Sequence, residues 1–167
     1  MKMPVLSFVG RSGTGKTTVI EKLIPLLASK GIRVAAIKHH LSDFEMDREG
    51  KDSYRLKLAG AKLAIVVSPK KIGLVEDLDR ELDLEELLSR HVHDVDLVIT
   101  EGYKSESAPR IEVYHVGEQA PLSLGLKNLL ALVTDKPMEA SVPVVQRDDV
   151  EKLADFIMER LRLQRTA

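Results

Sequence analysis

Apolar residues in this chain gather in short continuous runs, and several runs are followed by segments whose apolar side chains recur at helical spacing. Near-continuous runs of Val, Ile and Leu are typical of strands buried on both faces of a parallel sheet. The pattern therefore predicts an α/β protein with a mostly parallel sheet and helices on both faces. The predicted strands are 5–9, 33–38, 63–67, 96–100, 129–134 and 142–145, and the predicted helices begin at or near residues 16, 52, 83 and 149.

Three further segments have a weaker pattern. Residues 72–75 form a short apolar run that favours another strand. Residues 110–116 alternate between polar and apolar, which is typical of an edge strand or a hairpin arm, and such an edge could pair with a partner strand or a second subunit. Residues 39–51 are polar and acidic without a clear period. This last segment is long for a plain connection, and long ordered loops are often functional.

The segment between the first predicted strand and the first predicted helix reads GRSGTGKTT. Its glycines let successive backbone N–H groups point inward, and the helix N-terminus adds partial positive charge, so that phosphates can be held there. Lys16 can then reach the β- and γ-phosphates, and Thr17 can hold Mg²⁺. The motif predicts a P-loop NTPase fold with a nucleotide-binding loop formed by Gly10, Arg11, Ser12, Gly13, Thr14, Gly15, Lys16, Thr17 and Thr18.

P-loop proteins need a second acidic group opposite the loop, which holds Mg²⁺ directly or through water. Glu101 follows the strand 96–100 at its carboxyl end, where ligands bind in such folds, and is the first candidate. Asp96 lies at the other end of that strand and is interpreted as a solvated turn residue. The segment 43–52 is rich in carboxylates, and Asp52 could either complete the metal shell or cap the helix that it opens.

Polar residues also follow two other predicted strands. Lys38, His39 and His40 end one of them; a histidine pair often serves as a structural hydrogen-bonding group, but its place at a strand end gives a functional role equal weight. Asp135 follows another predicted strand and could accept hydrogen bonds from a guanine base, as Asp and Glu side chains of DNA-binding proteins accept from cytosine N4. A plain loop is an equal alternative, because no complete Asn-Lys-x-Asp signature is present.

The composition narrows the class of protein. Lys and Arg number 25 against 26 Asp and Glu, which does not indicate electrostatic binding to nucleic acid or to anionic membranes. There is no cysteine, so disulfides, thiolate metal sites and a cysteine nucleophile are excluded. No apolar run approaches the ~20 residues of a membrane span, and no signal-peptide core is present. We expect a single cytoplasmic domain over residues 1–167.

Four stretches carry a joint signature, namely GRSGTGKTT (10–18), KHH (38–40), GKDSYRLKLAGA (50–61) and DLVITEGYK (96–104). In this order and spacing they resemble one family, the molybdopterin-guanine dinucleotide biosynthesis adapter proteins (MobB). The first stretch is shared by many P-loop families, whereas the third and fourth together are more specific. Residues 130–135 and the closing pattern 148–157 also match, so the resemblance covers nearly the whole chain.

The resemblance implies a GTP-binding protein that helps the nucleotidyltransferase MobA attach GMP to molybdopterin. Members look like homodimers with weak GTPase activity, and Mg²⁺ accompanies the nucleotide; whether molybdopterin itself binds stays open. Carried onto this chain, Thr17 and Glu101 would lie at the metal, with Lys38, His39, Lys51 and Asp52 as polar residues near it.

Phosphoryl transfer requires positioning and charge neutralisation, which Lys16, Glu101 and Mg²⁺ would supply. No residue is an obvious base for activating water, so we expect slow hydrolysis. The chain departs from the family pattern at Leu41, where many relatives continue with histidine, and carries Arg11 where related dimeric ATPases have a lysine that reaches the partner's nucleotide. The alternatives are a P-loop kinase or ligase and a nucleotide-dependent dimer switch.

Overall fold

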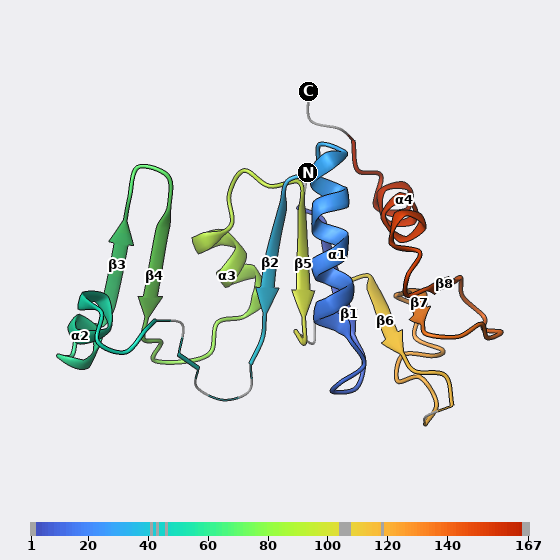
Figure 1. Ribbon diagram of the computed structural model, residues 1–167, viewed down its shortest axis with the longest axis horizontal. Helices are drawn as coiled ribbons and strands as arrows, with labels where there is room; N and C mark the ends of the chain where they lie inside the picture. Colours follow the sequence, from blue (N-terminus) through green and yellow to red (C-terminus); the bar gives the residue numbers. More distant parts are fainter. Residues whose placement is uncertain are drawn as a thin grey trace. The chain divides into compact units, whose positions relative to one another are not determined.

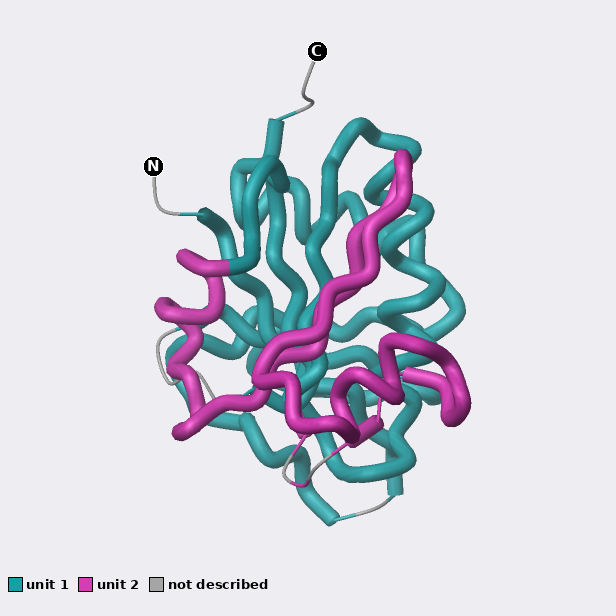
Figure 2. Tube along the Cα trace, turned by 90° about the vertical axis from the view of Figure 1, so that its left-hand side faces the viewer, with its two compact units in different colours: residues 1–39, 91–167 teal, residues 40–90 magenta. Residues whose placement is uncertain are grey.

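The computed structural model describes residues 3–40, 42, 44–45, 47–103, 108–117 and 119–164. The chain divides into two compact units, which have different colours in Figure 2. The sheet unit comprises Met1–His39 and His91–Ala167, and the hairpin unit comprises His40–Arg90. The expectation of one domain over residues 1–167 stays a prediction.

Among its described residues, the sheet unit has six strands in the order β2-β5-β1-β6-β7-β8, and every neighbouring pair is parallel (Figure 1). Parallel strands bring their carboxyl ends to the same edge of a sheet, so the loops that follow them gather there. This arrangement confirms the predicted α/β class with a parallel sheet. The strands are β1 (Val5–Val9), β2 (Val34–Lys38), β5 (Leu97–Glu101), β6 (Arg110–Tyr114), β7 (Leu129–Thr134) and β8 (Val144–Gln146).

Two helices of the sheet unit, α1 (Lys16–Ser29) and α4 (Val150–Leu161), share one apolar core with the strands. The strands contribute alternate side chains to this core, such as Leu6 and Phe8 of β1, so both helices cover the same face of the sheet. Full burial of such a side chain contributes about 1.5–3 kcal/mol to the free energy of folding. The buried helix residues are Val19, Ile20, Leu23 and Leu27 of α1 with Val150, Leu153, Ala154 and Ile157 of α4.

The opposite face of the sheet carries buried polar side chains. Ser7 and Thr100 share a hydrogen bond of 2.9 Å between β1 and β5. Glu112, in the middle of β6, is only 1% exposed, and its two carboxylate oxygens accept hydrogen bonds of 2.7 Å from the backbone N–H groups of Leu122 and Ser123. These bonds fix the segment after β6 to this face and satisfy the buried carboxylate.

The prediction that residues 110–116 form an edge strand or a hairpin arm is wrong. β6 lies between β1 and β7, pairs in parallel with both, and is buried along most of its length. The polar Glu112 produced the alternating pattern, but its charge is compensated by backbone donors and not by solvent. The backbone of this segment, which was expected to be free to pair with a partner strand, is therefore already paired on both sides within the sheet.

Among the described residues, the edge strands of this sheet are β2 and β8. β2 pairs with β5 alone and is half-exposed, although its apolar run predicted a buried strand. Its start is held by Asp96, whose carboxylate accepts hydrogen bonds from the backbone N–H of Arg33 at 2.8 Å and from the guanidinium at 2.9 and 3.0 Å. Asp96 is therefore an ion-paired anchor for this edge strand, which corrects its interpretation as a solvated turn residue.

The hairpin unit contains α2 (Asp52–Leu58), the antiparallel pair β3 (Leu63–Val67) and β4 (Ile72–Glu76), and α3 (Leu84–His91). The prediction of a strand at 63–67 is confirmed, but the prediction that it is buried is wrong. The pair forms a sheet of two strands only, so most of its apolar side chains remain exposed. The exposed large apolar residues of the pair are Leu63, Ile65, Val66, Val67, Ile72 and Leu74.

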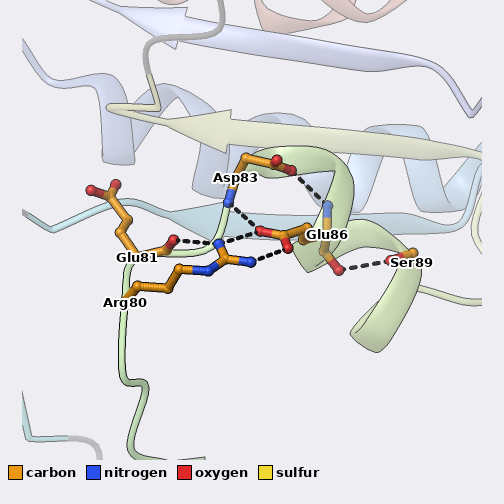
Figure 3. Close-up of polar contacts among 5 residues, drawn as sticks. All are labelled: Arg80, Glu81, Asp83, Glu86 and Ser89. Carbon is orange, nitrogen blue, oxygen red and sulfur yellow. Dashed lines mark hydrogen bonds and ion pairs between the residues drawn. The ribbon is translucent and has the colours of Figure 1, made fainter.

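The N-terminus of α3 is closed by a reciprocal cap (Figure 3). Asp83 Oδ1 accepts a hydrogen bond of 2.8 Å from the Glu86 N–H, and Glu86 Oε2 accepts one of 3.2 Å from the Asp83 N–H. Arg80 donates to both carboxylate oxygens of Glu86, at 2.7 Å from Nη1 to Oε2 and through Nη2 to Oε1. The hydrogen bonds from Arg80 and then from the Asp83 N–H lower the pKa of Glu86 to about 2.

Glu86→Gln should lower the stability of the protein in a way that depends on pH. Because the pKa of Glu86 is depressed in the folded state, its stabilising effect is present above the pKa of the unfolded chain and is lost as the pH falls through about 2. The difference in unfolding free energy between wild type and variant should therefore shrink between pH 5 and pH 3, measured by urea unfolding. Glu159→Gln, at an exposed position of α4, is the control; an equal pH dependence in both variants would contradict the assignment.

Candidate functional site

The glycine-rich loop leaves β1 at the carboxyl edge of the sheet and enters α1. Gly10 has a φ of +140°, and a Cβ atom at this position would lie 2.3 Å from the carbonyl oxygen of Val113 in β6. Only glycine fits such an approach, so the loop is held against the neighbouring strand. Thr14 is buried, and its hydroxyl donates a hydrogen bond of 2.9 Å to the Arg11 carbonyl, which fixes the turn.

Positive charge collects at this loop. Lys16 Nζ donates hydrogen bonds to the carbonyl oxygens of Gly10 at 3.0 Å and Arg11 at 2.8 Å, which places the ammonium group over the loop. α1 has no acidic residue in its first turn, so nothing on the helix itself offsets the partial positive charge of its N-terminus. The loop and the helix end together form a setting that suits an anion.

Glu101 lies at the end of β5, beside this loop. The register of the sheet sets it opposite Phe8 of β1 and Lys38 of β2. Thr17 Oγ1 donates a hydrogen bond of 2.8 Å to Glu101 Oε2, and Lys38 Nζ lies 3.4 Å from Oε1. The side chain of Glu101 is 14% exposed and that of Lys38 59%, so the carboxylate is the more enclosed partner.

The oxygens of Thr17 and Glu101 are the type of ligand that Mg²⁺ prefers, and they already lie side by side. In the part of the chain that the structure describes, no group of three or more His, Cys, Asp or Glu side chains could hold a metal ion. A magnesium ion here would therefore take most of its remaining ligands from phosphate groups and water, as is usual for Mg²⁺.

His39 follows β2 and connects the ends of two strands. Its backbone N–H donates a hydrogen bond of 2.9 Å to the Glu101 carbonyl. Its ring meets that of Tyr103 edge to face, with 4.9 Å between the ring centroids. A Cβ on Gly102 would lie 3.2 Å from the His39 carbonyl oxygen, so the two chain segments are in close contact. His39 thus supports the segment that carries Glu101.

Asp135 follows β7, and both of its carboxylate oxygens have partners. Oδ1 accepts a hydrogen bond of 2.8 Å from the Val116 N–H, and Oδ2 lies 3.4 Å from His115 Nδ1. The Val116 bond is the main cause of the lowered pKa of Asp135, with a further contribution from His115. Asp135 therefore joins the loops that follow β6 and β7.

Arg147 extends this group of residues to the glycine-rich loop. Its Nη2 lies 3.3 Å from His115 Nδ1. Its Nη1 would lie 3.4 Å from a Cβ atom built on Gly15. The Nδ1 atom of His115 can accept from Arg147 when it carries no proton, or donate to Asp135 when it does.

Arg147 and His115 do not appear among the residues that the sequence singles out. Both directly follow strands, and Arg147 lies between the predicted strand 142–145 and the cap of the last helix. The rule that ligands bind beyond the carboxyl ends of parallel strands could have drawn attention to Arg147. His115 was hidden because its segment was interpreted as an edge strand.

The structure brings several of the predicted site residues together within the sheet unit. The loop residues 10–18 lie with Lys38, His39 and Glu101 at one edge of the sheet unit. Lys51 and Asp52 belong to the hairpin unit, where Asp52 opens α2, is 95% exposed and lies 3.7 Å from Arg55. Leu41, Asp43 and Lys104 lie outside the described residues.

A parallel sheet with a clamped glycine-rich loop before its first helix defines the class of P-loop NTPase α/β proteins. A family model described as molybdopterin guanine dinucleotide synthesis protein B (MobB) matches residues 5–135. The chain belongs to this MobB family.

Individual relatives are similar over nearly their whole length. The molybdopterin-guanine dinucleotide biosynthesis adapter protein of Escherichia coli (strain K12) is 40% identical over 167 residues, which cover 97% of this chain and 95% of that protein. The protein of the same name from Haemophilus influenzae is 34% identical and covers 93% of this chain, with 88% of its own length matched. A crystal structure of molybdopterin-guanine biosynthesis protein B superposes with a TM-score of 0.75 at 33% identity, covering 95% of this chain and 99% of that one.

Hydropathy adds one observation to this picture. Within the described residues, no helix combines the length and the apolar character that crossing a membrane requires.

Proposed function

We propose that this chain is a GTP-binding adapter in the biosynthesis of molybdopterin guanine dinucleotide, where it assists a MobA-type guanylyltransferase. The family assignment and the names of the related proteins support the adapter role. GTP and Mg²⁺ are the ligands that we propose for the glycine-rich loop. A cytoplasmic location and a contact with molybdopterin remain predictions.

The hydrogen bond between Thr17 and Glu101 is the observation that carries the nucleotide-binding proposal. It joins the first turn of α1 to the carboxyl end of β5, and it sets two oxygen ligands beside the loop that Lys16 covers. A phosphate-binding loop with a cation and a metal-binding pair at its mouth suits a nucleotide with Mg²⁺.

The surroundings of Glu101 support slow hydrolysis. Its carboxylate is engaged by Thr17 at Oε2 and by Lys38 at Oε1, which suits a role in holding the site more than a role in taking a proton from water. A general base has to reach the proton that it abstracts within hydrogen-bond distance. We therefore propose at most a weak GTPase activity for this chain.

Two arguments support the proposed preference of this chain for guanine nucleotides, namely its membership of the family and the position of Asp135. The carboxylate of Asp135 lies at the carboxyl edge of the sheet but is engaged by Val116 and His115. It would have to exchange one of these partners to accept hydrogen bonds from a guanine base. Base recognition by Asp135 thus remains a prediction.

We also propose a homodimer. The apolar side chains of β3 and β4 are exposed in the single chain, and exposed apolar patches of this kind often form protein–protein contacts. Gel filtration with light scattering should show twice the monomer mass both with and without nucleotide. A monomer under both conditions would contradict this part of the proposal.

Calorimetric titration with GTP, ATP and GDP, each with and without Mg²⁺, tests the proposed function. We expect binding of GTP and GDP to exceed that of ATP, and we expect Mg²⁺ to strengthen the binding of GTP. Equal or tighter binding of ATP would contradict the GTP assignment and favour the kinase or dimer-switch alternatives. Failure to bind any nucleotide would contradict the proposal as a whole.

Lys16→Ala should weaken GTP binding by roughly 100-fold or more, since it removes hydrogen bonds from a cation to phosphate. The thermal unfolding temperature should change little, because the hydrogen bonds of this side chain to described residues are those to two carbonyls of the loop. Lys22→Ala, at an exposed position later in the same helix, is the matched control and should bind GTP like the wild type. Unchanged GTP affinity in Lys16→Ala would contradict the assignment of this loop as the phosphate-binding site.

Glu101→Gln should lower the affinity for Mg²⁺ in the presence of GTP by about 10- to 100-fold, a loss of the size seen when residues of a metal site are changed. Asp96→Asn, at the opposite end of the same strand, should leave this affinity unchanged and lower only the thermal stability, because it disturbs the anchor to Arg33. Magnesium titrations at fixed GTP measure both variants. The reverse order of effects would show that the wrong carboxylate has been assigned.

A further inference from the structure

Arg147 is held against the glycine-rich loop by the fold of the sheet unit. Its backbone N–H donates a hydrogen bond of 2.8 Å to the Thr134 carbonyl, which continues the pairing of β8 with β7. Its guanidinium reaches Gly15, the residue before α1, where Nη1 would lie 3.4 Å and Cζ 3.7 Å from a Cβ atom. The position of the side chain is therefore set by backbone pairing and by the neighbouring loop.

The guanidinium of Arg147 has few partners for a group in this position. Its Nε atom is buried and has no hydrogen-bond partner among the described residues. Its one side-chain hydrogen-bond partner in the described part of the chain is His115, a neutral acceptor or a cation, and no described carboxylate forms an ion pair with it. An enclosed donor without an acceptor is costly, so a missing partner is expected at this place.

The electrostatic surroundings point to the charge of that partner. Arg147 lies beside the N-terminus of α1, which carries partial positive charge, and Lys16 lies over the same loop. Like charges in one place are unfavourable until an anion binds between them. The forked guanidinium matches the oxygens of a phosphate group in particular.

We infer that Arg147 is a second phosphate-contacting cation of this site, acting with Lys16, and that His115 positions its guanidinium. This inference rests on the proposed nucleotide binding and adds a residue to it. The phosphate chain of a nucleoside diphosphate or triphosphate is the group that Arg147 contacts. Asp135 supports the arrangement through its contact with His115.

The test compares four proteins, namely the wild type, Arg147→Ala, Arg147→Lys and the control Lys152→Ala, which removes one exposed cation of α4. Affinities for GDP and for inorganic pyrophosphate are measured with Mg²⁺, the latter by displacement of a fluorescent guanine nucleotide. Arg147→Ala should weaken both ligands by about tenfold or more, which is the usual effect of one hydrogen-bonded charge. Arg147→Lys should fall in between, and Lys152→Ala should equal the wild type.

Several outcomes would overturn the inference. If Arg147→Ala binds both ligands like Lys152→Ala, Arg147 makes no contact with phosphate. If GDP binding falls while pyrophosphate binding does not, the contact is with the nucleoside. If pyrophosphate fails to displace nucleotide from the wild type, the site does not hold the phosphate chain by itself, and the inference is overturned. If the wild type binds no nucleotide, the proposed function and the inference fail together. Thermal unfolding of each variant separates loss of the phosphate contact from loss of the fold. If the alanine variant unfolds, the ligand affinities of Arg147→Lys still test the inference.

The positioning role of His115 is tested by a double-mutant cycle. His115→Ala should weaken GDP binding in the wild type but cause no further loss in Arg147→Ala, because it acts through the guanidinium. An equal loss in both backgrounds would show that His115 acts independently and would overturn its assigned role.

Discussion

The parallel pairing of β5 with β1 and β2 is the constraint on which the candidate site depends. It sets Glu101 level with Phe8 and Lys38, and thereby brings its carboxylate within hydrogen-bond distance of Thr17. A slip of one residue would turn the apolar side chains of β5 to the opposite face, so burial of Leu97 and Ile99 in the core fixes the register. The apolar core thus determines the position of a polar group at the edge of the sheet.

The charge at that edge differs from the charge of the whole chain. Acidic and basic residues nearly balance overall, at 26 against 25. Around the glycine-rich loop, however, the cations Lys16 and Arg147 lie next to the positive end of α1, while the nearby carboxylates of Glu101 and Asp135 are engaged by their own partners. Such a local excess of positive charge is suited to a phosphate group, and a balanced composition gives no sign of it.

The two units also use polar and apolar residues differently. In the sheet unit the buried carboxylate of Glu112 fixes a loop by accepting hydrogen bonds from two backbone N–H groups. In the hairpin unit apolar side chains of β3 and β4 remain exposed, because two strands alone cannot bury both of their faces. An apolar run or an alternating pattern is therefore a guide to a strand, but not to whether that strand is central, at an edge or exposed.

The sequence by itself determined the features that depend on neighbouring residues. These are the glycine-rich loop between strand and helix, the cap of α3 by Asp83, most of the strands, and a cap of α4 at Asp148 or Asp149, of which the structure uses Asp149. Only the tertiary structure decided that β6 is central and β2 lies at the edge, that Asp96 anchors Arg33, and that Arg147 reaches Gly15. The physical reason is the range of the interactions: caps and turns form within a few residues, whereas strand order and the contacts across it join segments that are far apart in the chain.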